Sequence, residues 1–198
     1  MLRLFSVADN LTRSKRKCKI KYSNVERFKA MADIHVFFRK SEDRSDAYKL
    51  LEQAFESVFK MSAPAVATDK NGKPYFPERA DVHFSLSHSG KYVMCALSTD
   101  IIGADIQKAQ VISDKMTSRV FTENELKTAD SLSLWCLKES FIKLKGKLDR
   151  PYREMEFLKS ENDFCGPDDT WGAVINEIDG YTAAVCAENA GNVNVSLL

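Results

Sequence analysis

The chain contains the stretch Leu134-Trp-Cys-Leu-Lys-Glu-Ser-Phe-Ile-Lys-Leu-Lys-Gly146. Its apolar residues recur at helical spacing, which predicts a helix over 131–145 with one apolar stripe. Gly146 stands where such a helix would end, because glycine adopts the left-handed backbone of a helix terminus at little cost. Glu139 and Lys143 are four residues apart and so are neighbours on one helical face. The spacing fits either an exposed ion pair or a metal-binding carboxylate beside a phosphate-binding ammonium.

Helical and strand patterns surround this stretch. A second helix is predicted over 45–61 by its apolar spacing, and Thr122 with Glu125 three residues later forms a capping-box pattern that starts a third. Strands are expected at 1–7, 82–86, 92–97 and 101–106, and in a hairpin of 171–178 with 181–187 around Asp179-Gly180. The mixture predicts an α+β fold, with long helices packed on antiparallel strands.

The predicted strand at 101–106 carries the segment Gly103-Ala-Asp-Ile-Gln107. Side chains alternate along a strand, so Asp105 and Gln107 share one face while Ala104 and Ile106 face the core. A carboxylate and an amide oxygen on one face can both bind a hard cation. A strand end that emerges into solvent would give the same pattern.

The segment Phe84-Ser-Leu-Ser-His-Ser-Gly90 places His88 in a predicted turn between two strands. A histidine there can contact a ligand or be structural. The neighbouring serines suggest a hydrolase, but adjacent residues on a strand point in opposite directions. The sequence also lacks the Gly-x-Ser-x-Gly nucleophile elbow, which argues against that function.

Composition favours a protein without membrane or nucleic-acid partners. The 198 residues carry a net charge of +1, and no apolar run is long enough to span a bilayer. The five cysteines are odd in number and contain no Cys-x-x-Cys, which argues against a disulfide framework or zinc ribbon and fits a reducing cytoplasm. The basic run from Arg13 to Lys21 is a solvated surface, or a site that attracts an acidic partner or a phosphorylated ligand. It lacks the interleaved aromatics of a nucleic-acid site.

Taken in order, the motifs resemble those of 4′-phosphopantetheinyl transferases of the larger, surfactin-synthetase-activating (Sfp) type. They are Gly72-Lys-Pro74, the segments 84–90 and 103–107, and Trp135-Cys-Leu-Lys-Glu-Ser-Phe-Ile-Lys143. The Trp-x-x-Lys-Glu-Ser/Ala-x-x-Lys block is highly specific to that family and is intact here. The resemblance extends from about residue 71 to residue 147 and includes the segment 181–187.

The resemblance implies a pseudo-dimer of two similar α+β halves, with coenzyme A in the cleft between them. The N-terminal half, 1–98, would supply coenzyme A phosphate contacts, and the C-terminal half, 99–198, the metal and catalytic motifs. Such an enzyme moves the 4′-phosphopantetheine arm of coenzyme A to a serine of an apo acyl or peptidyl carrier protein and releases 3′,5′-ADP. It would use Mg²⁺, or Mn²⁺, and work as a monomer in the cytoplasm.

The resemblance also assigns site residues. Asp105 and Glu139 match metal ligands, and Gln107 stands where many members have a third, acidic ligand. Glu125 matches the general base that takes the serine proton, and Lys143 would neutralise phosphate charge. The expected coenzyme A contacts are Arg44, Lys73, Ser87, His88 and Lys143, and the expected carrier-docking residues are Lys115, Met116 and Arg119.

Three other functions compete with this one. A non-catalytic relative would bind coenzyme A or a carrier protein without transfer, and Gln107 is the feature that favours it. Another metal-dependent phosphotransferase or hydrolase would need a different nucleophile, and none is evident. A nucleic-acid-binding module would use the basic run and bind in a salt-sensitive way.

Overall fold

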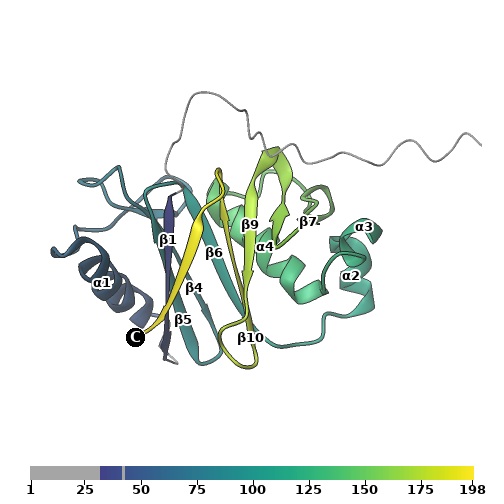
Figure 1. The fold of residues 1–198 in the computed structure, drawn as a ribbon, viewed down its shortest axis with the longest axis horizontal. Helices are drawn as coiled ribbons and strands as arrows, with labels where there is room; N and C mark the ends of the chain where they lie inside the picture. Colours follow the sequence, from purple (N-terminus) through teal and green to yellow (C-terminus); the bar gives the residue numbers. More distant parts are fainter. Residues whose placement is uncertain (1–31, 42) are drawn as a thin grey trace, which may run out of the picture.

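A computed structural model describes residues 32–41 and 43–198 of the chain. The strand predicted over 1–7 and the basic run at 13–21 lie outside the described residues. The rest of the chain forms the mixed α+β fold that the sequence predicts (Figure 1).

The strands of the described residues form two main sheets and a short ribbon. The first sheet has the order β11 (Asn192–Leu197), β1 (Asp33–Lys40), β5 (Tyr92–Ser98) and β4 (His83–Ser89). The second has the order β6 (Ile102–Lys108), β10 (Tyr181–Ala187), β9 (Trp171–Ile175), β8 (Asp163–Cys165) and β7 (Leu158–Ser160). The ribbon pairs β2 (Ala67–Thr68) with β3 (Pro74–Tyr75). Neighbouring strands are antiparallel, except that β11 runs parallel to β1.

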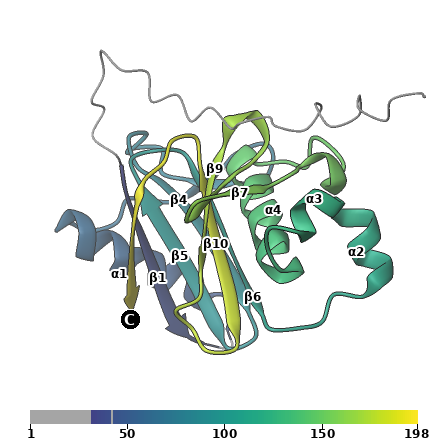
Figure 2. The same cartoon turned by 45° about the vertical axis from the view of Figure 1, so that its right-hand side comes forward.

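The helices lie on the outer faces of the two sheets. They are α1 (Asp46–Phe59), α2 (Asp114–Val120), α3 (Glu123–Leu126) and α4 (Ser131–Lys145), with short 3-10 turns η1 (Tyr152–Glu154) and η2 (Pro167–Asp169). In Figures 1 and 2, α1 covers the first sheet at one end of the molecule, and α4, α2 and α3 lie beyond the second sheet at the other end. The chain therefore stacks as helix, sheet, sheet, helix.

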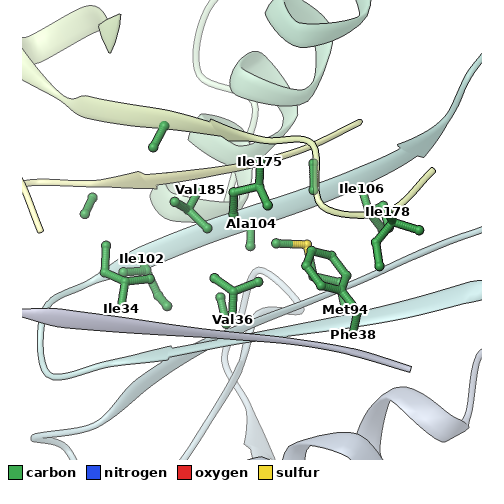
Figure 3. Close-up of a cluster of buried hydrophobic side chains, with 14 of the residues drawn as sticks. Ile34, Val36, Phe38, Met94, Ile102, Ala104, Ile106, Ile175, Ile178 and Val185 are labelled. Atoms are coloured by element: carbon green, nitrogen blue, oxygen red, sulfur yellow. The ribbon is translucent and has the colours of Figure 1, made fainter. Parts of the chain in front are cut away.

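Side chains alternate between the two faces of each strand, so a separate hydrophobic core forms between each pair of neighbouring layers. In β10, Ala183 and Val185 face the core between the sheets, while Ala184 and Cys186 face α4. In β5, Met94 likewise packs between the sheets, and its neighbours on either side pack against α1. Figure 3 shows the central core, with β1 contributing from one side and β6, β9 and β10 from the other.

Local sequence signals located most of these elements correctly. Helix α4 spans the predicted 131–145, and Gly146 follows it with a φ of +72°. Thr122 and Glu125 form the predicted capping box at the start of α3. The interior strand β1 and the edge strand β11 were not predicted, although Asn192-Val-Asn-Val-Ser-Leu197 alternates polar and apolar residues. The position of His88 in a turn is wrong, because β4 continues to Ser89 and holds His88 in the strand.

The cysteines of the described residues differ in their bonding state. Cys95, Cys136 and Cys186 are free and buried. Cys165 is disulfide-bonded, a bond that the spacing of the cysteines did not predict. Within the described part of the chain, no helix has the length and apolar character to cross a membrane.

The two sheets meet through serine hydroxyls between β4 and β6. Ser85 Oγ accepts a hydrogen bond from Ala104 N at 2.9 Å, and Ser89 Oγ accepts one from Lys108 N at 2.9 Å. Ser87 Oγ accepts one from Ile106 N at 3.3 Å. Three alternate serines of one edge strand therefore satisfy three alternate N–H groups of the other. This serine seam sets β6 in register with β4.

Helix α4 lies directly on β6 at Gly103. A Cβ atom at this position would collide with the carbonyl oxygen of Ser140 and the backbone nitrogen of Leu144, and would lie 2.9 Å from Leu144 Cα. Only a residue without a side chain allows this approach of helix to strand. Ser140 is equally confined, since its buried hydroxyl donates to Ala184 O of β10 at 2.9 Å.

A buried ion pair joins α3 to α4. Lys138 Nζ lies 2.7 Å from Glu125 Oε1, and both side chains are fully buried. Glu125 also accepts hydrogen bonds from Thr122 N and Phe157 N, while Lys138 donates to the carbonyl oxygens of Tyr152 and Met155. Every charge in this network has a partner, which is the condition under which a buried pair is tolerated.

We expect Glu125→Gln to lower the free energy of unfolding by about 3–5 kcal/mol, because it leaves Lys138 buried without a counter-charge. Urea denaturation measures this change. Glu123→Gln is the matched control on the exposed side of α3, and its expected effect is within about 0.5 kcal/mol. Equal stability of the two variants would contradict the network.

Candidate functional site

A cavity of about 640 Å³ opens between the first sheet with α1 and the second sheet with α4. Its wall combines side chains from both halves of the chain, between Arg44 and Lys147. From the N-terminal side come the start of α1, the turn at 71–74 and β4, and from the C-terminal side Asp105 of β6 and the end of α4. The volume falls within the usual range of small-molecule sites, about 300–1,000 Å³.

Asp105 is the centre of a polar cluster on the cavity wall. It is buried, with its Oδ1 atom 2.7 Å from Lys143 Nζ and accepting a hydrogen bond of 2.8 Å from Ser87 Oγ. Its Oδ2 atom accepts a hydrogen bond of 2.9 Å from Gln107 Nε2. The contact confirms that Asp105 and Gln107 share one face of β6, and both neighbours Ala104 and Ile106 are in the core as predicted.

Glu139 lies on the same wall, one turn of α4 before Lys143. Burial raises the pKa of Glu139, and repulsion by the Asp105 carboxylate acts in the same direction. A hydrogen bond of 2.5 Å from the hydroxyl of Tyr152 to Glu139 Oε1 opposes these effects. Two carboxyl groups on one cavity wall form a site where a bound cation would stabilise the charged form of Glu139.

Lys143 joins the two sides of the cavity. Its ammonium pairs with Asp105 of β6 and also donates to Ser87 Oγ at 2.8 Å and Leu86 O at 3.3 Å. The sequence suggested an exposed pair with Glu139 as one possibility. The structure instead directs Lys143 to Asp105 and Ser87, because the contact at Gly103 brings α4 within reach of both strands.

Three further predicted ligand contacts also line the cavity. His88 lies beside Ser87 on β4 and has a buried Nε2 atom without a hydrogen-bond partner among the described residues. Arg44 lies just before α1. Lys73 donates to the carbonyl oxygens of Leu144, at 3.0 Å, and Ile102, at 3.4 Å, and burial lowers its pKa.

Two predicted site residues do not line the cavity. Glu125 is fully buried and forms an ion pair with Lys138, and each of its carboxylate oxygens already has a partner. Gln107 lies next to the cavity and contacts Asp105 through its amide nitrogen, so its amide oxygen is turned from that carboxylate. The structure thus brings together Arg44, Lys73, Ser87, His88, Asp105, Glu139 and Lys143, and leaves Glu125 apart.

The predicted docking residues form a separate exposed surface. Lys115, Met116 and Arg119 are exposed on α2. The helix begins at a Ser113 cap, whose hydroxyl accepts from Met116 N, and Arg153 donates to the carbonyl oxygens of Ser118 and Phe121 at its other end. The helix is therefore fixed at both ends while its outer side stays accessible.

Sequence reasoning missed Tyr152 and the roles of Ser85 and Ser89. Tyr152 follows α4 in a segment without clear periodicity, so no local signal connected it to Glu139. The alternate serines at 85, 87 and 89 were a usable signal, since hydroxyls at every second position of a strand share one face.

The donor set at this site fits a hard divalent cation. Asp105 and Glu139 supply carboxylate oxygens, the ligands that Mg²⁺ prefers, and Mg²⁺ retains water in its remaining positions. Within 32–41 and 43–198, no three or more His, Cys, Asp or Glu side chains cluster as a metal site. The two carboxylates would therefore hold such a cation together with Gln107, solvent or ligand oxygens.

Comparison with known proteins points to one family. A sequence model of the 4′-phosphopantetheinyl transferase superfamily matches residues 101–186. The 4′-phosphopantetheinyl transferase Sfp of Bacillus subtilis (strain 168) is 36% identical over 138 residues, which cover 61% of this chain and 62% of that protein. A second relative from Bacillus subtilis, 4′-phosphopantetheinyl transferase ffp, is 37% identical over 59% of each chain.

A third relative, 4′-phosphopantetheinyl transferase gsp of Aneurinibacillus migulanus, is 32% identical over 63% of this chain and 57% of its own length. The chain thus spans about three fifths of the length of these curated relatives. The matched segment contains Asp105, Glu139 and Lys143. The resemblance inferred from the motifs is confirmed: residues 101–186 match the 4′-phosphopantetheinyl transferase superfamily, and the chain is similar to Sfp-type members of it.

Proposed function

We propose that this chain transfers the 4′-phosphopantetheine arm of coenzyme A to a serine of an apo acyl or peptidyl carrier protein and releases 3′,5′-ADP. One observation carries the proposal. Asp105, Glu139 and Lys143, which match the two defining motifs of the family, converge on one cavity. The names of the relatives support the same reaction.

The charges of the cavity wall suit the phosphates of coenzyme A. Arg44, Lys73, Lys143 and Lys147 line it together with His88. Lys73 uses two of its three N–H groups on backbone carbonyls, so one remains for a phosphate oxygen. His88 lines the same wall and is the second proposed phosphate contact. We place the diphosphate near Lys143, because only that lysine also reaches Asp105.

Asp105 and Glu139 would hold the metal ion. Gln107 would become a third ligand through its amide oxygen once its side-chain amide turns over, because its nitrogen faces Asp105 in the structure. Bound there, Mg²⁺ would act as a Lewis acid that neutralises charge on the diphosphate and the leaving group. Lys143 donates into the same region and stabilises developing phosphate charge. The protein supplies no covalent nucleophile in this scheme, so its own contribution is orientation and electrostatics.

Glu125 fits a structural role better than the role of general base. Its carboxylate is buried and saturated by Lys138 and two backbone N–H groups. A group that accepts a proton from an incoming serine must be within hydrogen-bond reach of it, directly or through one water. We propose that Glu125 fixes α3 against α4 and η1.

The exposed side of α2 is our proposed docking site for the carrier protein. Lys115 and Arg119 offer positive charge and Met116 offers an apolar contact, so the surface suits an acidic partner. We also propose that residues 1–98 and 99–198 form two similar halves with coenzyme A between them. Strand β11 departs from this division, because it belongs to residues 99–198 but pairs with β1 in the first sheet. We further propose that the protein acts as a monomer in the cytoplasm.

The first expected outcome is a gain in carrier-protein mass. After incubation with the chain, coenzyme A and Mg²⁺, an apo carrier should gain one phosphopantetheine arm, and a chelator should abolish the gain. Intact-mass analysis measures it. Asp105→Asn and Glu139→Gln should each reduce the rate by orders of magnitude in folded protein, with Glu123→Gln as a control. No gain across several carriers, with Mn²⁺ also tried, would favour a non-catalytic relative.

A second expected outcome separates the two roles of Glu125. The double variant Glu125→Met/Lys138→Met replaces the buried pair by apolar side chains, which is often neutral for stability. We expect this variant to fold and to retain transfer. Because Lys138 also holds the backbone of Tyr152, only a folded double variant that fails to transfer even at excess Mg²⁺ would show that Glu125 takes part in the chemistry.

A third expected outcome concerns Gln107. Gln107→Glu adds a charged oxygen beside Asp105 and should lower the Mg²⁺ concentration that gives half-maximal transfer, because each added carboxylate strengthens the binding of a hard cation. A metal titration of the transfer rate measures this. A higher requirement for Mg²⁺ would place Gln107 outside the metal site.

The docking surface predicts a fourth outcome. Arg119→Glu should raise the KM for the carrier protein about tenfold, through repulsion of an acidic partner, and leave the KM for coenzyme A unchanged. Lys159→Glu, an exposed charge reversal on β7, serves as the control. Equal effects of the two variants would remove α2 from the docking surface.

A further inference from the structure

We propose that Tyr152 is a positioning residue, which holds the Glu139 carboxylate in the orientation that binds the metal ion. The inference rests on the proposed function for the identity of the reaction. It assigns a role to a residue outside the motifs on which the family resemblance depends.

The Tyr152 hydroxyl donates a hydrogen bond of 2.5 Å to Glu139 Oε1. This oxygen is then engaged, and the other oxygen of Glu139 remains for a ligand in the cavity. A free carboxylate at the end of a glutamate side chain rotates readily, because its last torsion is broad. One strong hydrogen bond to a single oxygen removes most of that freedom.

The ring of Tyr152 is itself fixed on α4. It stacks on Trp135 with ring centroids 5.3 Å apart and an angle of 5° between the planes. Trp135 and Glu139 are four residues apart, so both contacts of Tyr152 are made to one face of the helix. The stack sets the plane of the ring, and the ring sets the position of its hydroxyl.

The backbone of Tyr152 is held from the other side. Its carbonyl oxygen accepts a hydrogen bond of 2.8 Å from Lys138 Nζ, the buried ammonium paired with Glu125. Arg153, the next residue, donates to Phe121 O at the end of α2. Tyr152 is therefore restrained at its backbone, its ring and its hydroxyl, which is more than packing alone requires.

The restraint matters because the described site has only two acidic ligands. Gln107 is neutral, so Asp105 and Glu139 must provide the whole negative charge. Asp105 is fixed by Lys143, Ser87 and Gln107. Glu139 has Tyr152 in the corresponding role. Groups that orient metal ligands typically contribute 10–100-fold to metal affinity, and the structure gives Tyr152 the geometry of such a group.

The test is the Tyr152→Phe variant of the full chain, with Mn²⁺ as the probe. The substitution keeps the ring and its stack on Trp135 and removes only the hydroxyl. Isothermal titration of Mn²⁺, with coenzyme A absent, should give about tenfold weaker binding than in the unaltered chain. Thermal unfolding should be nearly unchanged. Tyr92→Phe deletes the same atom from a tyrosine outside the cavity wall and should leave the affinity unaltered.

A second measurement distinguishes positioning from a structural role. Excess Mg²⁺ should restore transfer by the Tyr152→Phe variant, because the defect is in metal binding. A rate that stays low at all Mg²⁺ concentrations, or an unchanged Mn²⁺ affinity, would overturn the role of Tyr152 alone. Failure of the unaltered chain to bind Mn²⁺ would overturn the metal site and, with it, this inference. Failure of transfer despite normal Mn²⁺ binding would contradict only the proposed function.

Discussion

The contact between α4 and β6 at Gly103 determines where the polar groups of the cavity lie. Because no side chain separates helix from strand, the backbone of α4 rests on the strand that carries Asp105. Lys143 then reaches Asp105, and Glu139 reaches the same cavity one turn earlier. A larger residue at position 103 would force the helix outward, and the carboxylates would separate. The glycine of this motif is therefore as much a part of the site as the aspartate.

The serine seam places the site at the boundary between the two sheets. Backbone N–H groups of β6 bind hydroxyls of β4, so the edge strands are joined through side chains. Ser87 has a further function, because its hydroxyl also contacts Asp105 and Lys143. The same residue thus links the sheets and orders the charged groups. This arrangement explains why the cavity draws its wall from both halves of the chain.

Local periodicity in the sequence predicted the helix and strand that hold the site residues. The positions of the other residues depend on tertiary contacts, which the local sequence does not show. The spacing in 131–145 gave the full extent of α4, and strand alternation placed Asp105 beside Gln107. Lys138 is a charged residue next to Glu139 in the sequence, yet it is fully buried because Glu125 provides its counter-charge. The capping-box pattern placed Glu125 in the first turn of a helix. It could not predict that Glu125 also pairs with Lys138. Tyr152 depends on three distant partners, so its position could not be inferred from its neighbours.

The parallel pairing of β11 with β1 has a kinetic consequence. β1 ends at Lys40 and β11 begins at Asn192, so two neighbouring strands of one sheet are made at opposite ends of the described chain. Contacts between residues so distant in sequence form slowly, because the intervening chain must be ordered first. During synthesis on the ribosome, β1 therefore has one open edge until the segment 192–197 has emerged. An open strand edge is a place where other chains can pair, which makes that interval the period in which this protein is most exposed to aggregation.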